Sequence, residues 1–520
     1  MTRSLRLLAV LLAAALGCAG SRPAPAPAAP AAAPQPQAAA APAGADRTQV
    51  PAAGEAPELH LPRQQHFALA NGLRVRLVEH RRLPIVALNL VVRAGAVNDP
   101  AGLPGLASFT ASMLTEGGTR TRTATRLSDE VGFLGASLGA GAGQDAASLS
   151  GSSLSRHLPK LLDLFADVAM NPAFRAKDFA RVQDQRKVTL LQQRDQPATI
   201  AGKAFLKAYW GEGHPYGHYV LGDEASVAAT RPADLAAFHA RFWRPANAEL
   251  VVVGDVSEGE LRPLLERTLG KWPAGTAAAA PRAPAPAAPH VTLLLDKPDA
   301  PQTLVMLGMP GLARASPDYV AATVAFQVLG GGMSSRLFRT LREEKGYTYG
   351  MGAGADARRL GGVSIVHGNV KAEVTGAALG DLLGEIRKLR EQPVGDAELA
   401  DARNALVRSL PADFATVGGI AGRVAELVIH GLPDDYWNGY ADAVRHVAPA
   451  DVQRIAERYL DPARATLVLV GTPAAVRPQL EGLAIGKVEV RPVPGAAPVR
   501  APPRSPRVRT QRPRASSPAP

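Results

Sequence analysis

The chain has few cysteines, no long apolar run, and a C-terminal segment without acidic or aromatic residues, and each of these absences excludes a structure or a function. Cys18 is the only cysteine, so no disulfide can form within the chain. The apolar run at residues 7–16 is too short to span a bilayer. Residues 491–520 contain seven arginines but no acidic and no aromatic residue. The segment has no aromatic side chains interleaved for base stacking, which argues against binding of nucleic acid.

The N-terminus resembles a bacterial lipoprotein signal. Arg3 and Arg6 precede the apolar run, and Cys18 follows a small residue at its end. We expect residues 1–18 to be this signal and Cys18 to be lipidated, which anchors the mature chain to a membrane. The next residues do not resemble the aspartate that retains such proteins at the inner membrane, so we expect an outer membrane lipoprotein facing the periplasm. An ordinary cleaved signal, giving a soluble periplasmic protein, is the alternative.

Segments of biased composition divide the rest of the chain. Residues 19–58 are rich in proline and alanine and predict a disordered tether, and residues 273–289 predict a linker of similar composition. Residues 486–520 predict a disordered basic tail, which supplies more than half of the formal net charge of +12. This tail either attracts anionic lipid or lipopolysaccharide or is simply solvated. A periplasmic location is a second argument against nucleic acid as a partner.

A repeat divides the body into two homologous domains. Residues 232–254 return at 449–471 with a constant offset and no gap. Each copy predicts an amphipathic helix, an aromatic and proline turn, and an apolar strand that ends at glycine. We therefore expect domains at 59–272 and 290–485. In each, strands come first and long helices come after them, which predicts an α+β fold with helices on an antiparallel-rich sheet.

The segment 102–114 has the frame of a zinc motif without its ligands. It resembles the inverted motif H-x-x-E-H of the insulinase/pitrilysin metallopeptidases, with Ser108, Ala111 and Ser112 at the three chemical positions. The family's third zinc ligand is a Glu on a later helix. The corresponding stretch, 179–197, contains no Glu, and the alignment puts Gln192 in that place, give or take a residue or two.

These residues cannot perform zinc chemistry. Serine hydroxyls and a neutral amide are poor zinc ligands, and Ala111 lacks the carboxylate that would deprotonate the attacking water. We therefore expect no metal or other cofactor in this chain. The resemblance also implies the fold: two homologous insulinase-type domains, antiparallel-rich sheets covered by helices, that form half of a clamshell.

The second domain keeps another part of the family's pattern. Residues 329–350 are similar to a signature in which an Arg and a Tyr seven residues later reach into the active site, here Arg342 and Tyr349. A guanidinium can anchor a peptide carbonyl or carboxylate, and a phenol can donate to a developing oxyanion. The alternative is structural: a buried Arg342 paired with Glu343 or Glu344, and a tyrosine in the core.

This asymmetry suggests a function. In bacterial two-chain members of the family one subunit carries the zinc motif and the other keeps the Arg/Tyr pair, and the mitochondrial processing peptidase divides its labour in a related way. The chain resembles the non-metal partner. We expect it to be inactive alone, to bind peptide, and to contribute Arg342 and Tyr349 to a zinc site held by a homologous subunit in a heterodimer or larger complex. The alternatives are a standalone peptide-binding or scaffold lipoprotein and a peptidase with a relocated metal site.

Three further patterns favour structure over chemistry. His214 and His218 are four residues apart, but Pro215 and Gly217 oppose the helix that would present both rings to a metal. Gly135-Ala-Ser137-Leu-Gly139 matches the nucleophile-elbow pattern, yet it comes after a predicted helix (127–134) and has no ordered Asp and His companions. Residues 144–150 predict a strand, which as an edge strand could pair with an extended peptide.

Overall fold

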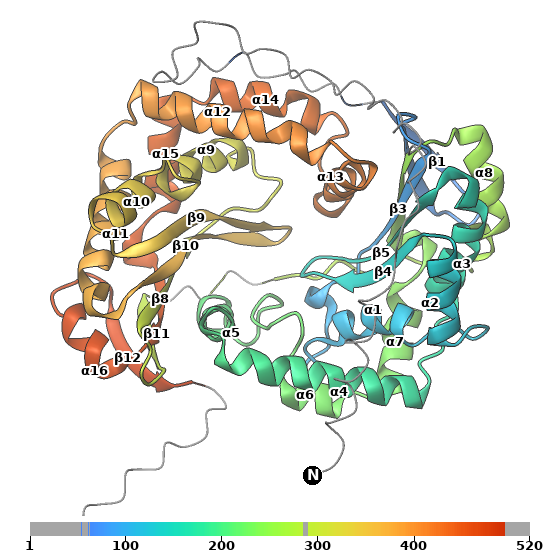
Figure 1. Cartoon of the computed structure of the whole chain (residues 1–520), viewed down its shortest axis with the longest axis horizontal. Helices are drawn as coiled ribbons and strands as arrows, with labels where there is room; N and C mark the ends of the chain where they lie inside the picture. Colours follow the sequence, from blue (N-terminus) through green and yellow to red (C-terminus); the bar gives the residue numbers. More distant parts are fainter. Residues whose placement is uncertain (1–53, 55–60, 62, 284–285, 287–289, 494–520) are drawn as a thin grey trace, which may run out of the picture. The chain divides into compact units, whose positions relative to one another are not determined.

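A computed structural model describes residues 54, 61, 63–283, 286 and 290–493 (Figure 1). Its helices and strands all belong to the compact unit Ala56–Pro520. Cys18, the signal at 1–18, nearly all of the tether at 19–58 and most of the basic tail lie outside the described residues. No helix in the described part of the chain has the length and apolar character needed to cross a membrane.

Each half of the described chain contributes one sheet and a set of helices. The elements of the first half are β1 (Gln64–Ala68), β2 (Arg74–Glu79), β3 (Ile85–Val92), α1 (Leu106–Glu116), α2 (Ala124–Phe133), β4 (Ser137–Ala142), β5 (Ala147–Leu154), α3 (Leu158–Met170), α4 (Ala176–Gln192), α5 (Pro197–Trp210), α6 (Glu224–Ala229), α7 (Pro232–Phe242), β6 (Ala248–Gly254) and α8 (Glu258–Arg267).

The second half has the same general order. Its elements are β7 (Val291–Asp296), β8 (Gln302–Pro310), α9 (Tyr319–Gly330), α10 (Arg336–Phe338), the π-helical turn η6 (Arg339–Glu344), β9 (Thr348–Arg358), β10 (Gly361–Lys371), α11 (Thr375–Glu391), α12 (Asp396–Asp413), α13 (Val417–His430), α14 (Tyr436–His446), α15 (Pro449–Tyr459), β11 (Thr466–Gly471), α16 (Pro473–Val476) and β12 (Lys487–Pro492).

The two sheets have the same topology in their five shared strands. Within the described residues the strand orders are β1-β2-β6-β3-β5-β4 and β12-β7-β11-β8-β10-β9. β2 and β6 pair in parallel, as do β7 and β11, and the remaining pairs toward β4 and β9 are antiparallel. The predicted α+β fold with two homologous domains is therefore confirmed.

The sixth strand of each sheet differs between the halves, and it corrects one predicted boundary. β1 pairs antiparallel with β2, whereas β12 pairs parallel with β7. β12 begins at Lys487, inside the segment predicted to be tail, so the fold continues past residue 485. The composition concealed this strand because its arginine and proline resemble those of the tail, while its residues still pair with β7.

The predicted strand at 144–150 is also corrected. The structure places the strand at Ala147–Leu154, and β5 pairs with β3 on one side and β4 on the other, so it is not an edge. The edge strand on this side of the sheet is β4. The serines of β5 had suggested an edge, but Ser148, Ser150 and Ser152 alternate with buried residues and lie on a less covered face of the sheet, and Ser153 is itself buried.

The central strands are mostly apolar because both faces of each sheet are covered, with Glu249 of β6 and Asn89 of β3 as polar exceptions. In β6, Leu250 and Val252 pack among the helices of the first half, whereas Val251 and Val253 face the opposite side. That opposite side is covered by α13 from the second half, which contacts β3 and β6. A strand buried on both faces cannot alternate with polar residues.

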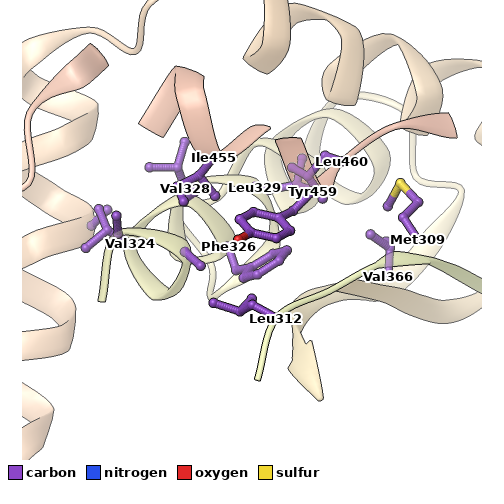
Figure 2. Close-up of a cluster of buried hydrophobic side chains, with 14 of the residues drawn as sticks. Met309, Leu312, Val324, Phe326, Val328, Leu329, Val366, Ile455, Tyr459 and Leu460 are labelled. Carbon is purple, nitrogen blue, oxygen red and sulfur yellow. The ribbon is translucent and has the colours of Figure 1, made fainter. Parts of the chain in front are cut away.

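The second sheet is covered in the corresponding way by α5 from the first half. α5 contacts β8 and β11, and its Phe205 and Tyr209 join a buried cluster with Val468 and Val470. Gly308 of β8 permits this contact, because an added Cβ would lie 2.1 Å from Cζ of Phe205. On the other face, α9 packs on the sheet and α15 packs on α9. Figure 2 shows the rings of Phe326 and Tyr459 next to each other, within the cluster that also contains Met309 and Val366.

A hydrogen-bond network joins the β9–β10 turn to the first half. The Tyr216 hydroxyl donates to the Asp145 carboxylate and accepts from the Leu360 amide at 3.1 Å. Asp145 also accepts from the Arg359 amide at 3.0 Å, and the Arg358 guanidinium lies 4.8 Å from the centroid of the Tyr216 ring. Burial and the adjacent Asp145 carboxylate raise the pKa of Tyr216, so the hydroxyl remains a donor at neutral pH.

Candidate functional site: a guanidinium within the zinc-motif frame

The helix that carries the zinc-motif frame is α1, and Asp99 fixes where it begins. The Asp99 carboxylate accepts from the amides of Gly105 and Ala107, each at 2.7 Å, which satisfies amides that an isolated helix start would leave unpaired. Gly105 has φ 91°, and an added Cβ would lie 2.6 Å from the amide of Gly222. Glycine is needed here because the chain at 221–222 approaches so closely.

This approach places the backbone of residues 220–221 against the first turn of α1. The Ser108 hydroxyl donates to the Val220 carbonyl at 2.6 Å and lies 3.0 Å from the Gly105 carbonyl. The Ser112 hydroxyl donates to the Ser108 carbonyl at 3.0 Å. Ala111 is fully buried. Both hydroxyls are therefore held by local backbone carbonyls.

The side chain from α4 that reaches these two serines is Arg186. Its guanidinium donates to the Ser108 Oγ at 2.8 Å and to the Ser112 Oγ at 3.3 Å. It also lies 4.7 Å from the centroid of the Phe109 ring and donates to the Leu221 carbonyl at 3.4 Å. Arg186 is 7% exposed, and within the described residues it has no ion-pair partner. Burial lowers the pKa of Arg186 to about 10, so it still carries its charge at pH 7.

The α4 side chain that faces Ser108 and Ser112 is that of Arg186, and not that of Gln192 as the alignment predicted. Gln192 is the last residue of α4 and is exposed, and no contact joins it to either serine in the described part of the chain. Arg186 lies in the same glutamate-free stretch. Its position could have been found only by knowing which face of α4 packs on α1.

This set of side chains does not fit a zinc ion. Two neutral hydroxyls offer weak ligation, and the guanidinium between them is a fixed positive charge that repels a divalent cation. More widely, the described residues contain no group of three or more His, Cys, Asp or Glu side chains arranged to hold a metal. The alternative of a relocated metal site therefore has no donor set in this part of the chain.

The two histidines near α5 take part in local packing. His218 Nε2 lies 3.1 Å from the Asp99 carboxylate, so it contacts the residue that starts α1. His214 Nδ1 accepts from the Tyr216 amide at 2.9 Å, and its ring stacks on Trp210 at 4.5 Å between centroids. The segment between them is a turn and not a helix, as its proline and glycine predicted.

Arg342 and Tyr349 are brought together at the surface of the second half. Arg342 lies in η6, donates to the Tyr349 carbonyl at 2.7 Å and stands 4.2 Å from the centroid of the Tyr349 ring. Tyr349 lies near the start of β9 at 84% exposure, and in the described residues Arg342 has no ion pair with Glu343 or Glu344. The structure therefore does not show the buried, salt-bridged alternative. No contact joins the pair to Ser108 or Ser112 among the described residues.

The nucleophile-elbow pattern does not form an elbow. Ser137 is the first residue of β4, shortly after α2, and its hydroxyl lies 2.8 Å from the hydroxyl of Ser152 on β5. In the described residues no His or Asp side chain is hydrogen-bonded to it. This helix-to-strand connection is the reverse of the strand-to-helix turn that exposes a nucleophile.

Sequence and structure comparisons identify the family to which this fold belongs. A model described as "Insulinase (Peptidase family M16)" matches residues 74–216, and one described as "Peptidase M16 inactive domain" matches 231–406. The fold and both models thus define a two-domain homologue of zinc peptidases. The chain belongs to the insulinase (M16) peptidase family.

Individual relatives support the same conclusion. A protein of Mycobacterium leprae named an uncharacterized zinc protease is 32% identical over 295 residues, which is 55% of this chain and 65% of that protein. A Rickettsia bellii protein of the same description is 23% identical over 388 residues, 74% of this chain and 90% of its own. The match thus spans slightly under two thirds of the Mycobacterium leprae relative.

Among solved structures, a peptidase M16 inactive domain from Pseudomonas fluorescens is similar at a TM-score of 0.74 and 29% identity. It covers 79% of this chain and 99% of its own. A protease from Helicobacter pylori has a TM-score of 0.73 at 21% identity and covers 79% of this chain and 100% of its own, which shows the fold.

Proposed function

We propose that this protein is the zinc-free subunit of a heteromeric M16 endopeptidase. It binds an extended peptide and contributes Arg342 and Tyr349 to a zinc site that a homologous partner holds. The single observation that carries the proposal is the contrast between two sites: Arg186 fills the zinc-motif frame, whereas Arg342 and Tyr349 stay paired at the surface. The relatives named zinc proteases and the neighbour named an inactive domain are consistent with a lineage containing both kinds of chain.

The loss of the zinc site is supported by the chemistry at Arg186. Loss of the zinc ligands alone would leave the space beside the two serines without a charged group. Here the buried guanidinium of Arg186 is hydrogen-bonded to both serines. The site is therefore stable without metal, and catalysis needs zinc from another chain.

The Arg342–Tyr349 pair supports a role with substrate. Arg342 is held by the Tyr349 carbonyl and ring, so its direction is fixed before a ligand arrives. An oriented guanidinium can bind a peptide carbonyl, and the exposed phenol can donate to an oxyanion that forms beside it. A zinc ion held by a homologous partner would supply the remaining chemistry of hydrolysis.

The expected location at the outer membrane is compatible with the proposed function. A lipid on Cys18 and the tether at 19–58 would hold the folded halves near the outer membrane on the periplasmic side, where the partner and peptide substrates meet it. A soluble periplasmic form would leave the proposed chemistry unchanged.

Affinity purification of the tagged full chain from its native membrane tests the proposal. We expect a near-stoichiometric homologue that carries H-x-x-E-H, and zinc-dependent peptidase activity in the complex. In that complex Arg342→Ala should lower kcat/KM by about a hundredfold, the scale for loss of one oriented donor. Arg339→Ala is the matched control, because Arg339 is an exposed arginine of the same turn that pairs with Glu398. A complex indifferent to Arg342→Ala would refute the proposed contribution.

One observation favours a second candidate, a standalone peptide-binding lipoprotein. β4 is an edge strand within the described residues, and an extended peptide can add to such an edge without any partner subunit. Recovery of the chain alone from gently solubilised, undiluted membranes, with peptide still bound, would favour this candidate over the split enzyme.

A further inference from the structure

Two pockets meet at Arg93, just after β3, where α13 lies on the first sheet. One pocket, of about 380 Å³, is lined by residues of β1, β2 and α13. The other, of about 290 Å³, is lined by Arg359, the last residues of α13 and linker residues 277–281. Arg93 and Val428 line both. Neither pocket includes a residue of the zinc-motif frame or of the Arg342–Tyr349 pair, so a ligand bound here would not depend on the proposed function.

The backbone of Arg93 is fixed, but its side chain has no partner in the described residues. Its amide donates to the Asn247 carbonyl at 3.1 Å, and the Asn247 side chain donates back to the Arg93 carbonyl at 3.2 Å. No hydrogen bond or ion pair reaches the Arg93 guanidinium within the described part of the chain. A positioned arginine thus presents unused donors to both pockets.

The neighbouring charges make an unpaired Arg93 unfavourable. Arg93 is exposed as a whole, but its partial burial lowers its pKa, and the charges of Arg74 and Arg359 act in the same direction against the carboxylate of Glu249. Glu249 is already bound by Arg74 at 2.9 Å and by Arg76. The carboxylate nearby therefore does not neutralise Arg93, and an added anion would relieve the repulsion.

Two further groups on the smaller pocket lack hydrogen-bond partners in the described chain. The Nδ1 atom of His430 and the Nε atom of Arg359 are both buried without one. Arg359 Nε forms a long ion pair with the Asp145 carboxylate, and the separation of 4.0 Å is too large for a hydrogen bond. Buried polar groups are normally satisfied, so these two nitrogens lack a partner that a ligand could supply, and the exposed guanidinium of Arg93, unpaired in the described residues, lines the same pocket.

The walls of the smaller pocket indicate the chemistry of the ligand that would fill it. Alanine and proline of the linker, with Val428 and Ile429 of α13, give the smaller pocket an apolar side opposite the basic groups. Its volume is at the lower end of the range for small-ligand sites. We propose that Arg93, Arg359 and His430 bind a carboxylate or phosphate group carried on a small apolar body. Guanidinium groups bind both oxyanions in a bidentate manner, and the two sources are separated by experiment.

Calorimetric titration of the full chain tests this site with three probes: N-acetylleucine, its neutral amide, and inorganic phosphate. We expect N-acetylleucine to bind and the amide not to bind. Phosphate binding without N-acetylleucine binding would assign the site to phosphate and retain the oxyanion. Failure of both anions to bind, or equal affinity for the acid and the amide, would overturn the proposal.

Matched variants locate the binding. Arg93→Gln should weaken the bound anion at least about tenfold, the scale of one lost charged hydrogen bond. Arg82→Gln removes the same charge from an exposed turn outside both pockets and should leave affinity unchanged. Unaltered melting temperatures would show that both variants fold. An anion affinity that survives Arg93→Gln would refute the site, and a rise in the NMR-measured pKa of His430 on binding would support it independently.

Discussion

Replacing Arg186 with methionine should change the stability of the fold very little. Arg186 is a buried charge without a carboxylate partner in the described residues, and folding lowers its pKa from its ordinary value to about 10. That shift corresponds to a cost of about 3 kcal/mol for keeping the charged form in the folded state. Since the folded pKa is the lower one, this cost is present at every pH below about 10 and fades as the pH rises above that value.

The hydrogen bonds of Arg186 act in the opposite direction. Its bonds to Ser108, Ser112 and the Leu221 carbonyl contribute on the order of 1 kcal/mol each, and only the first is short. Methionine keeps much of the side-chain volume against Phe109 and removes both the charge cost and the hydrogen bonds. These contributions nearly cancel, so we expect the free energy of unfolding to change by less than about 1.5 kcal/mol.

Alanine at position 186 is the contrasting variant. It also removes the stem that packs on Phe109 and leaves a cavity between α1 and α4, so it should destabilise by about 2–4 kcal/mol. Urea unfolding at pH 7, monitored by circular dichroism, measures both variants against the parent chain. If Arg186→Met loses as much stability as Arg186→Ala, the guanidinium itself holds the two helices together and the expected cancellation is wrong.

Two other outcomes are expected from the structure. The combined variant S108H, A111E, S112H and R186E should bind one equivalent of zinc, as measured by mass spectrometry. The same variant with Arg186 retained should bind no zinc. Zinc uptake by both variants would show that the guanidinium does not prevent zinc binding. Burial lowers the pKa of His239 to about 4, below its ordinary 6.5, so the stability present above pH 6.5 should fall by about 3 kcal/mol as the pH drops to 4. In urea titrations across that range His239→Gln should show a smaller loss, and an identical acid slope would contradict this assignment.

Much of the fold could be predicted from the sequence, because the strongest signals are local. The gap-free repeat of 232–254 at 449–471 identified two related halves, and the apolar strands β6 and β11 lie where each copy placed a strand. The bounds of the strand predicted at 144–150 and the end of the second domain were misplaced. Small serines and a basic strand carry too little pattern to show pairing, which depends on residues far away in the sequence.

The candidate site could be predicted only in part. The absence of ligands at Ser108, Ala111 and Ser112 was readable from the sequence, but the residue that faces them was not. Gln192 and Arg186 are separated by about 9 Å along the helix axis, and only Arg186 reaches the two serines. The packing of α4 on α1 alone selects Arg186. The exposure of Tyr349 likewise depends on how η6 meets β9 and not on any local pattern.

α5 and α13 each pack on the sheet of the other half, and this exchange bears on the role of the linker at 273–289. Each helix completes the sheet of the half to which it does not belong in sequence, so neither half can bury its own sheet alone. A chain severed in the linker would remain assembled, in the way that a dimer with exchanged segments does. The covalent linker therefore fixes the ratio of the two halves at one to one, whereas the packing of α5 and α13 on the opposite sheets holds the halves together.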